Sequence, residues 1–343
     1  MKSFKLTGIR QMEVFDVPEP TAKDDQVVVE LAAIGVCGSD VHYYVNGNIG
    51  SQVVEYPFAV GHECAGTVVK TGGSVSSLKE GDRVAVDPAM PCWKCDQCKA
   101  GRHHTCRNLK FLGCPGQAEG CLSEYIAMPE TSCVKLPEGM SFTRGALSEP
   151  LAIGVYAVRL SIPMQDAKVA ILGVGPIGLS VLLAAKAGGA ETVFATDKLD
   201  YRLKAAKQAG ADAAGNPDKQ NIVKQAAVVE PGGFDVVFEC CGQQDALDQA
   251  IEILKPGGKL MVVGIPQEDR VSFCPDKTRR KEICIQNVRR QVDCVDATLE
   301  MMADGRLNAD FMATHRFGFD AAQEAFDLVS NYQDGVIKAM IDF

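Results

Sequence analysis

The sequence predicts an α/β protein of two domains, a β-rich domain followed by a domain built on a doubly wound parallel sheet. Up to about residue 142 the chain consists of short β-branched runs, such as Gln26–Ala32 and Gly66–Lys70, which Gly and Pro interrupt at close intervals. From Leu151 onward, apolar strands alternate with helix-like runs, and this alternation requires crossover connections and a parallel sheet. A chain of 343 residues also exceeds what one hydrophobic core usually holds, so two domains are expected.

We place the first domain at residues 1–155 and the second at residues 156–293. The end of the chain, residues 294–343, returns to a mixed texture, and we expect it to complete the first domain. The elements predicted in the second half are, in chain order, a helix at Leu151–Leu160, a strand at Lys168–Leu172, a helix at Leu179–Ala187, a strand at Glu191–Thr196, a helix at Tyr201–Ala209, and strands at Asp235–Cys240, Lys259–Val263 and, more weakly, Ile283–Val288.

Composition and charge exclude several classes of function. Apolar residues make up 46% and charged residues 23%, as in ordinary globular proteins. Asp and Glu exceed Lys and Arg by 44 to 35, giving a net charge of −9 with no basic block, so neither nucleic acid nor an anionic membrane surface is an expected partner. The uncharged run Val169–Ala185 is too short and too rich in Gly for a membrane span.

The start of the chain and the cysteine content indicate a cell compartment. The opening MKSFKLTGIRQMEVF carries charges every few residues, so we expect no export signal and a cytoplasmic protein. The 14 cysteines are then reduced thiols, some of them in metal sites, rather than disulfides.

A glycine-rich turn follows the strand Lys168–Leu172. Gly173, Gly175 and Gly178 have the spacing that allows a tight turn, a close approach to a pyrophosphate and close helix–strand packing, with the helix N-terminus facing the phosphates. Asp197 ends the next strand, about 20 residues later, where a carboxylate accepts the ribose hydroxyls of NAD and repels the 2′-phosphate of NADP. Arg202 is either a contact of the adenosine end or a solvated helix arginine. The pattern predicts NAD binding.

Four cysteines, Cys92, Cys95, Cys98 and Cys106, lie close together in the sequence. Zinc takes four thiolates in a tetrahedron, and a short loop supplies them without a core beneath it. Because all four positions are Cys, no position remains for water, and the predicted role is structural. An Fe–S cluster and free or disulfide-bonded cysteines are the alternatives.

A second, open metal site is predicted from three separate segments. These segments are Gly35–His42, Gly61–Gly66 and Ser148–Pro150, and each places a possible metal ligand beside Gly or Pro. A catalytic zinc keeps three protein ligands and one exchangeable position, and Cys37 and His62 are the evident pair.

Taken together, these motifs resemble the zinc-dependent medium-chain alcohol dehydrogenase family over nearly the full chain, and its sorbitol or polyol dehydrogenase branch most. Glu149 stands where ethanol-type enzymes have Cys. The segments that carry the resemblance are Cys37–His42, Gly61–Glu63, the four-Cys lobe, Glu149–Leu151, Gly173–Gly178, and, for the branch, Val41–Tyr44 and Thr314–Phe317. The resemblance implies a GroES-like catalytic domain, an inserted Rossmann domain with a cleft between them, and two zinc ions per chain.

The resemblance also implies the catalytic residues. Cys37 and His62 bind the catalytic zinc, with Glu63 or Glu149 completing its shell. Adjacent residues of a regular strand point to opposite faces, so His62 and Glu63 can share one metal only if the backbone bends there; otherwise Glu63 orients the site and Glu149 binds the metal or its water. Which of Glu63 and Glu149 ligates the zinc directly stays open.

In the mechanism that the resemblance implies, a secondary alcohol gives its proton to Ser39 and, through the cofactor ribose, to His42, while hydride passes to the nicotinamide. The implied substrate contacts are Tyr43, Glu149 and Arg290. The alternative for Tyr43 is an aromatic side chain that only packs in the protein interior. The implied cofactor contacts are Gly173, Gly175, Pro176, Ile177, Gly178, Asp197, Arg202, Val263, Gly264, Ile265, Val288 and Arg290.

Two departures from the branch bear on the substrate. This chain keeps the four-Cys lobe that many polyol dehydrogenases have lost, and Gln291 replaces the aromatic residue that usually follows the position of Arg290. The expected activity is oxidation of a sorbitol-like polyol to the ketose by NAD, in a homo-oligomer, dimer or tetramer. A threonine or simple secondary-alcohol dehydrogenase is the alternative, and a non-catalytic nucleotide-binding scaffold is a remote one.

Overall fold

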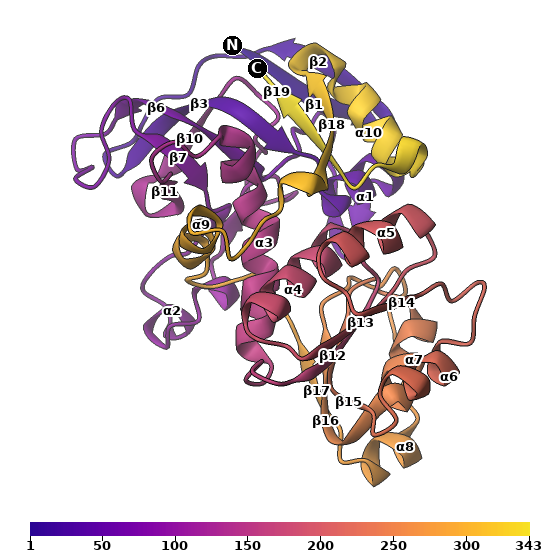
Figure 1. Ribbon diagram of the computed structural model, residues 1–343. Coiled ribbons are helices and arrows are strands. Elements are labelled where there is room, and N and C mark those ends of the chain that lie inside the picture. The colour runs from indigo at the N-terminus through magenta and orange to yellow at the C-terminus, as the bar shows by residue number, and fades with distance from the viewer. The chain divides into compact units, whose positions relative to one another are not determined.

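The computed structural model describes all residues, 1–343 (Figure 1). The chain forms two compact units. The first unit comprises Met1–Glu149, Val295–Asp304 and Met312–Phe343, and the second comprises Pro150–Cys294 and Gly305–Phe311. Residues 150–155, 294 and 305–311, which we expected in the first domain, group with the second unit.

The first unit is organised around strand β3 (Gln26–Gly35), which pairs antiparallel with β6 (Glu63–Thr71), β10 (Tyr125–Pro129) and β19 (Lys338–Asp342). Its sheet has the order β11-β7-β6-β3-β19-β18. Strand β19, yellow in Figure 1, is the end of the chain, and its Ile341 lies opposite Ile34 of β3. The last segment thus returns to the first unit's sheet. The reason is burial: the apolar side chains of β19 complete the core beneath β3.

The remaining elements of the first unit are short. Its other strands are β1 (Lys2–Gly8), β2 (Gln11–Asp16), β4 (Asn48–Ile49), β5 (Gln52–Val53), β7 (Arg83–Val86), β8 (Ala89–Met90), β9 (Lys110–Phe111), β11 (Cys133–Lys135) and β18 (Ala313–Gly318). Its helices are α1 (Gly38–Asn46), α2 (Asp96–Lys99), α9 (Val295–Ala303) and α10 (Ala322–Ser330), with 3₁₀ turns at His103–Thr105, Glu130–Ser132, Phe319–Ala321 and Gln333–Gly335. A further 3₁₀ turn, Asp310–Met312, bridges the two units' residue ranges.

The second unit is a six-stranded parallel sheet with the order β14-β13-β12-β15-β16-β17. Its strands are β12 (Lys168–Leu172), β13 (Thr192–Thr196), β14 (Ala213–Gly215), β15 (Phe234–Glu239), β16 (Leu254–Val262) and β17 (Cys284–Asn287). The helices between them are α4 (Pro176–Ala187), α5 (Asp200–Gln208), α6 (Ile222–Val229), α7 (Gln244–Ile253) and α8 (Pro275–Arg280). The predicted doubly wound parallel sheet is therefore present.

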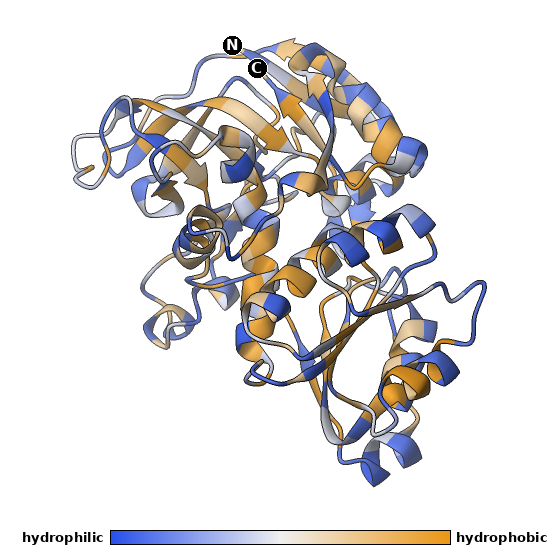
Figure 2. Cartoon of the chain, viewed as in Figure 1, coloured by the Kyte–Doolittle hydropathy of each residue, from blue (hydrophilic) through white to orange (hydrophobic).

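The two faces of this sheet are covered by different helices. Ile171 faces α4, whose Gly178 approaches its side chain, whereas Ala170 and Leu172 pack with residues of α6 and α7 in one cluster. Figure 1 shows α4 and α5 on one side of the sheet and α6 and α7 on the other. Because both faces of the sheet are buried, its strands are continuous runs of apolar residues. Among the helices, α4 is largely hydrophobic and α8 is hydrophilic (Figure 2).

Two predicted starts were wrong by more than three residues, and the other predicted helix and strand boundaries lie within three residues of the observed ones. Helix α3 (Phe142–Leu160) begins at Phe142, not at Leu151, and contains Pro150 in its interior. Strand β16 begins at Leu254, five positions before the predicted start at Lys259. No helix combines the length and the apolar character that crossing a membrane requires.

Candidate active site and metal centres

The open metal site forms where strand β3 ends beside the start of strand β6. Antiparallel pairing sets Gly35 opposite Glu63, and Cys37, two residues on, is the N-cap of α1. This register brings Cys37, His62 and Glu63 together, with one ligand atom of each lying within 4.8 Å of the others. A thiol, an imidazole and a carboxylate in this arrangement are a donor set that fits zinc.

The bend that lets His62 and Glu63 face one site is visible in the backbone. Gly61 has a φ of +97°, and regular strand β6 starts only at Glu63. His62 is therefore outside the strand, and the alternation of faces does not apply to the pair. Gly35 leaves space for the Glu63 side chain, because a Cβ at position 35 would lie 2.2 Å from Oε2 of Glu63.

Asp40 orients this site and was missed in the sequence analysis. Its Oδ1 lies 3.2 Å from Nδ1 of His62 and accepts the Gly61 N–H at 3.1 Å, while its Oδ2 accepts the Cys37 N–H at 3.3 Å. A carboxylate on one imidazole nitrogen fixes the ring and leaves the other nitrogen for a metal. The available signal was the capping box, since Asp40 is the third residue after the N-cap Cys37.

Lys338 is the second residue that sequence reasoning missed. Its Nζ is completely buried, donates to both carboxylate oxygens of Glu63 at 2.7 Å, and donates to the Val36 carbonyl at 3.1 Å. Burial, the largest single effect, lowers the pKa of Lys338, but the charge and hydrogen bonds of Glu63, together with the nearby Cys37 and Glu149, outweigh it and raise that pKa. The only signal was a lysine at the start of the mostly apolar end strand.

Glu149 lies near this site without joining the three clustered ligands. It is buried, and burial raises its pKa to about 7, against the opposing effect of His62. His62 is also perturbed: burial disfavours its charged form, yet the nearby Asp40 and Cys37 raise its pKa. A bound cation would favour the ionised form of Glu149, which burial disfavours.

Helix α1 carries the other implied catalytic residues of the first unit. Ser39 Oγ lies 3.3 Å from Cys37 Sγ. His42 follows one turn later, and burial lowers its pKa, so its imidazole is neutral at pH 7. Tyr43 is buried, and its hydroxyl donates to Oε1 of Gln52 at 3.2 Å, while Gln52 donates to the Cys114 thiol at 2.7 Å.

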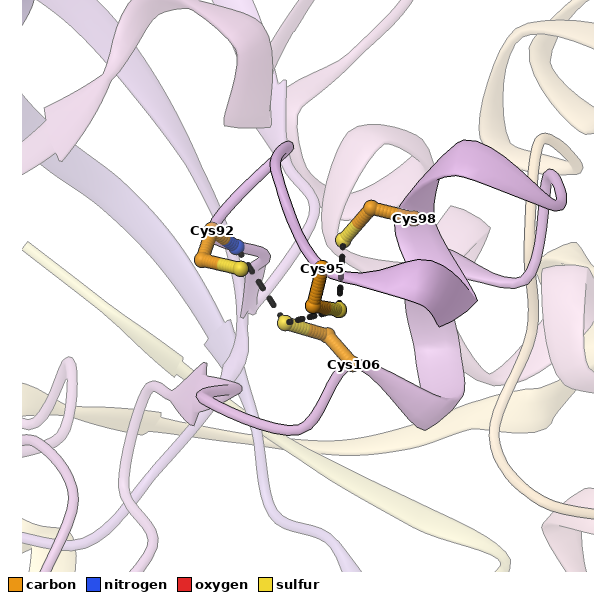
Figure 3. Close-up of side chains that lie close together, drawn as sticks. All are labelled: Cys92, Cys95, Cys98 and Cys106. Atoms are coloured by element: carbon orange, nitrogen blue, oxygen red, sulfur yellow. Dashed lines mark hydrogen bonds between the residues drawn. The ribbon is translucent and has the colours of Figure 1, made fainter.

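The four-Cys lobe closes around a common centre (Figure 3). The sulfur atoms of Cys92, Cys95, Cys98 and Cys106 lie within 4.8 Å of one another. Cys95 Sγ is 3.6 Å from Cys98 Sγ and 3.8 Å from Cys106 Sγ. A tetrahedron with Zn–S bonds of about 2.3 Å has edges of about 3.8 Å, so the thiols fit a closed zinc site.

Backbone hydrogen bonds and burial act on the thiols of this lobe in opposite directions. Hydrogen bonds from the Lys94 and Cys95 backbone N–H groups lower the pKa of the Cys92 thiol to about 6, while burial raises that of Cys98 to about 12. The Cys92 N–H also donates to Cys106 Sγ at 3.3 Å. The ion pair between Arg107 and Asp96, at 2.8 Å, joins the start of α2 to the residue after Cys106.

In the second unit, the glycine turn has the geometry that dinucleotide binding requires. Gly173 has a φ of +91°, and a Cβ on Gly178 would lie 1.9 Å from the Gly173 carbonyl, so no other residue fits there. Gly175 is the N-cap of α4, whose first residues are Pro176 and Ile177. The N-terminus of α4 thus lies at the carboxyl edge of the sheet, where its free N–H groups suit a phosphate.

Asp197 follows β13 at the same edge. Its Oδ2 accepts the Val174 N–H at 3.0 Å and its Oδ1 accepts the Leu199 N–H at 2.9 Å, which fixes the carboxylate beside the turn. Arg202 lies 3.8 Å from Asp197 and packs against Gly175, so it belongs to this end of the site. The other implied cofactor residues follow β16 and β17 in the same unit: Val263, Gly264, Ile265, Val288 and Arg290.

Comparison with known proteins identifies the family. The profile of the alcohol dehydrogenase GroES-like domain matches residues 23–138, and that of zinc-binding dehydrogenases matches residues 176–304. The sorbitol dehydrogenase of Bacillus subtilis is 34% identical over 342 residues, which is 99% of this chain and 97% of that protein.

Solved structures agree with the sequence comparison. An Escherichia coli oxidoreductase of unknown specificity superposes with a TM-score of 0.94 at 33% identity, covering 99% of this chain and 98% of that one. A zinc-binding dehydrogenase from Sinorhizobium meliloti bound to NADP gives a TM-score of 0.90 at 30% identity, covering 100% and 99%. This chain belongs to the zinc-dependent medium-chain alcohol dehydrogenase family, in its sorbitol and polyol dehydrogenase branch, and it is an enzyme that uses a nicotinamide cofactor.

Proposed function

We propose that this enzyme oxidises a secondary hydroxyl of a sorbitol-like polyol to the ketose, with NAD as the hydride acceptor. The observation that carries the proposal is the cluster of Cys37, His62 and Glu63, oriented by Asp40 and Lys338. These three residues would hold a catalytic zinc, with Glu149 beside it, and Cys92, Cys95, Cys98 and Cys106 would hold a structural one. A zinc ion at the open site supplies Lewis-acid stabilisation of the alcohol oxygen.

The chain's own residues then handle the proton. Ser39 lies beside the Cys37 thiol and accepts the alcohol proton. His42, one turn further along α1, is held neutral by burial and receives the proton for release to solvent. Tyr43, Glu149 and Arg290 supply hydroxyl, carboxyl and guanidinium groups that suit a polyhydroxylated chain. Gln52 and Cys114 restrain Tyr43 through the hydrogen bonds described above.

Asp197 supports NAD over NADP. It follows β13, and its carboxylate is fixed by two backbone N–H groups. A carboxylate at this position would accept the ribose hydroxyls of NAD and disfavour the 2′-phosphate of NADP. NADP is the competing assignment, because the similar zinc-binding dehydrogenase from Sinorhizobium meliloti is bound to NADP. We further propose that the chain forms a homo-oligomer, a dimer or tetramer, which sedimentation of the zinc-loaded protein would measure.

One experiment tests the assignment. Zinc-loaded enzyme is assayed with sorbitol, xylitol, galactitol, threonine and butane-2,3-diol, each with NAD and with NADP. We expect reduction of NAD by the polyols and loss of activity after chelation. Faster turnover of threonine or butane-2,3-diol would instead indicate a threonine dehydrogenase or a simple secondary-alcohol dehydrogenase. NADH binding without oxidation of any alcohol would favour a non-catalytic scaffold.

A further inference from the structure

Glu239 is a buried carboxyl group at the carboxyl edge of the second unit's sheet that the proposed mechanism does not use. It is the last residue of β15, and its relative exposure is 0%. In the sheet it lies opposite Leu172 of β12 on one side and Val262 of β16 on the other. An acid at this depth is costly unless it has partners or a function.

The two carboxyl oxygens of Glu239 are in different situations. Oε1 accepts the Cys241 N–H at 2.8 Å and the Gly242 N–H at 2.6 Å. Oε2 is buried without a hydrogen-bond donor, and no cationic side chain pairs with the group. A Cβ at position 264 would lie 2.7 Å from Oε2, so Gly264 leaves that oxygen in place. Glu239 is thus a fully buried carboxyl group whose charge, when it is ionised, is met by donors on one oxygen only.

The field of this charge reaches its neighbours. Burial and, after it, the charge of Glu239 raise the pKa of both the Cys240 and the Cys241 thiol. The backbone carbonyl of Glu239 also accepts the N–H groups of Val263 at 2.8 Å and Gly264 at 2.9 Å. The residue therefore lies between the loop after β15 and the loop after β16, and holds both.

Sheet order places these loops at one end of the cofactor. Dinucleotides bind across the carboxyl edge of such sheets where the strand order reverses, and here the reversal lies between β12 and β15. Asp197, after β13, marks the adenosine side. The nicotinamide end then falls on the other side of the reversal, over β15 and β16, which are the strands that Glu239 joins.

We propose that Glu239 acts through its charge to make the enzyme bind the oxidised cofactor more tightly, relative to the reduced one, than the fold alone would. The oxidised nicotinamide carries one positive charge and the reduced ring carries none, whereas the pyrophosphate and adenosine are the same in both. A negative group near the ring therefore stabilises only the oxidised form and raises the affinity for NAD relative to the affinity for NADH. This inference rests on the proposed binding of NAD.

The test compares two dissociation constants in zinc-loaded protein without alcohol. NAD and NADH affinities are measured by calorimetry for the wild type and Glu239→Gln, which keeps the shape and the acceptor for the two N–H groups. We expect the affinity ratio of NAD to NADH to fall by about fivefold, because unit charges within roughly 10 Å interact by more than thermal energy at protein permittivities. An unchanged ratio, with both constants shifted equally, would mean a merely structural role and overturn the inference.

Two further variants sharpen the result. Glu191→Gln removes an exposed charge just before β13, at the opposite edge of the sheet, and should leave both constants unchanged. Glu239→Asp keeps the charge, so its NAD-to-NADH affinity ratio should stay near the wild-type value, even if both affinities weaken. This variant also serves as the test if Glu239→Gln does not fold. A fivefold fall of the ratio for Glu239→Asp would overturn the inference. Wild-type protein that binds neither form would refute the proposed function instead.

Discussion

At the scale of single residues, the buried pair of Lys338 and Glu63 gives the strongest stability prediction. Replacing Lys338 by Met leaves the Glu63 carboxylate buried without its cation, and breaking such a pair typically costs about 3–5 kcal/mol. We expect Lys338→Met to lower the free energy of unfolding of the zinc-loaded protein, measured in urea, by about that amount. It should also weaken zinc binding at the open site, because Glu63 is no longer held.

An exposed pair provides the matched control for this prediction. Lys135 lies 3.0 Å from Asp82, with its side chain 53% exposed. Surface pairs contribute about 0–1 kcal/mol, so Lys135→Met should change stability little. If the Lys338 and Lys135 variants lost stability equally, the ion pair at the metal site would not have the importance assigned to it.

Residues whose roles depend on local sequence were predictable, and those that depend on distant pairing were not. Cys37 and His62 stand in recognisable turns. Lys338 meets Glu63 across 275 positions, and the contact exists only because β19 pairs with β3. Asp40 could have been found from its capping position. Whether Glu63 or Glu149 lies with the other metal ligands depended on a backbone bend at Gly61. Composition does not reveal that Gly61 has a φ of +97°.

At the scale of elements, the four-Cys lobe is the part whose assembly is most local. Serine provides no thiolate, so Cys98→Ser should lower the zinc content from two ions per chain to one, as measured by elemental analysis, and reduce stability. Cys284→Ser, at an exposed thiol outside both clusters, should retain both ions. Two ions retained in the Cys98 variant would show that the lobe is not a zinc site.

The same locality explains which elements the sequence analysis placed well. The strands and helices of the parallel sheet follow from runs of apolar residues buried on both faces. The start of α3 was misplaced because proline usually ends a helix, and the prediction therefore began after Pro150. In the structure the helix continues through Pro150, with Ala146, Leu147, Leu151 and Ala152 fully buried around it. Tertiary packing outweighs the missing backbone donor, and packing is not visible in a local pattern.

At the scale of the whole molecule, the chain divides its ligands between its two units. Both metal clusters lie in the first unit, while the glycine turn and Asp197 lie in the second. The return of the chain end to the first unit's sheet was expected, but the grouping of residues 305–311 with the second was not, because no texture distinguishes that segment. Each unit also has its own hydrophobic core, in the first around β3 and in the second between the sheet and helices α6 and α7.

This division predicts that zinc and cofactor stabilise different halves of the chain. A ligand stabilises the folded segment that binds it, by about 2.7 kcal/mol at a concentration of 100 times its dissociation constant. Hydrogen exchange of the apoenzyme should therefore be faster than that of the zinc-loaded enzyme around residues 92–106 and at the junction of β3 and β6. Saturation with NAD should instead slow exchange at the turn Gly173–Gly178 and after β13. Equal changes in both units on chelation would show that the whole chain opens as one cooperative structure, contrary to this prediction.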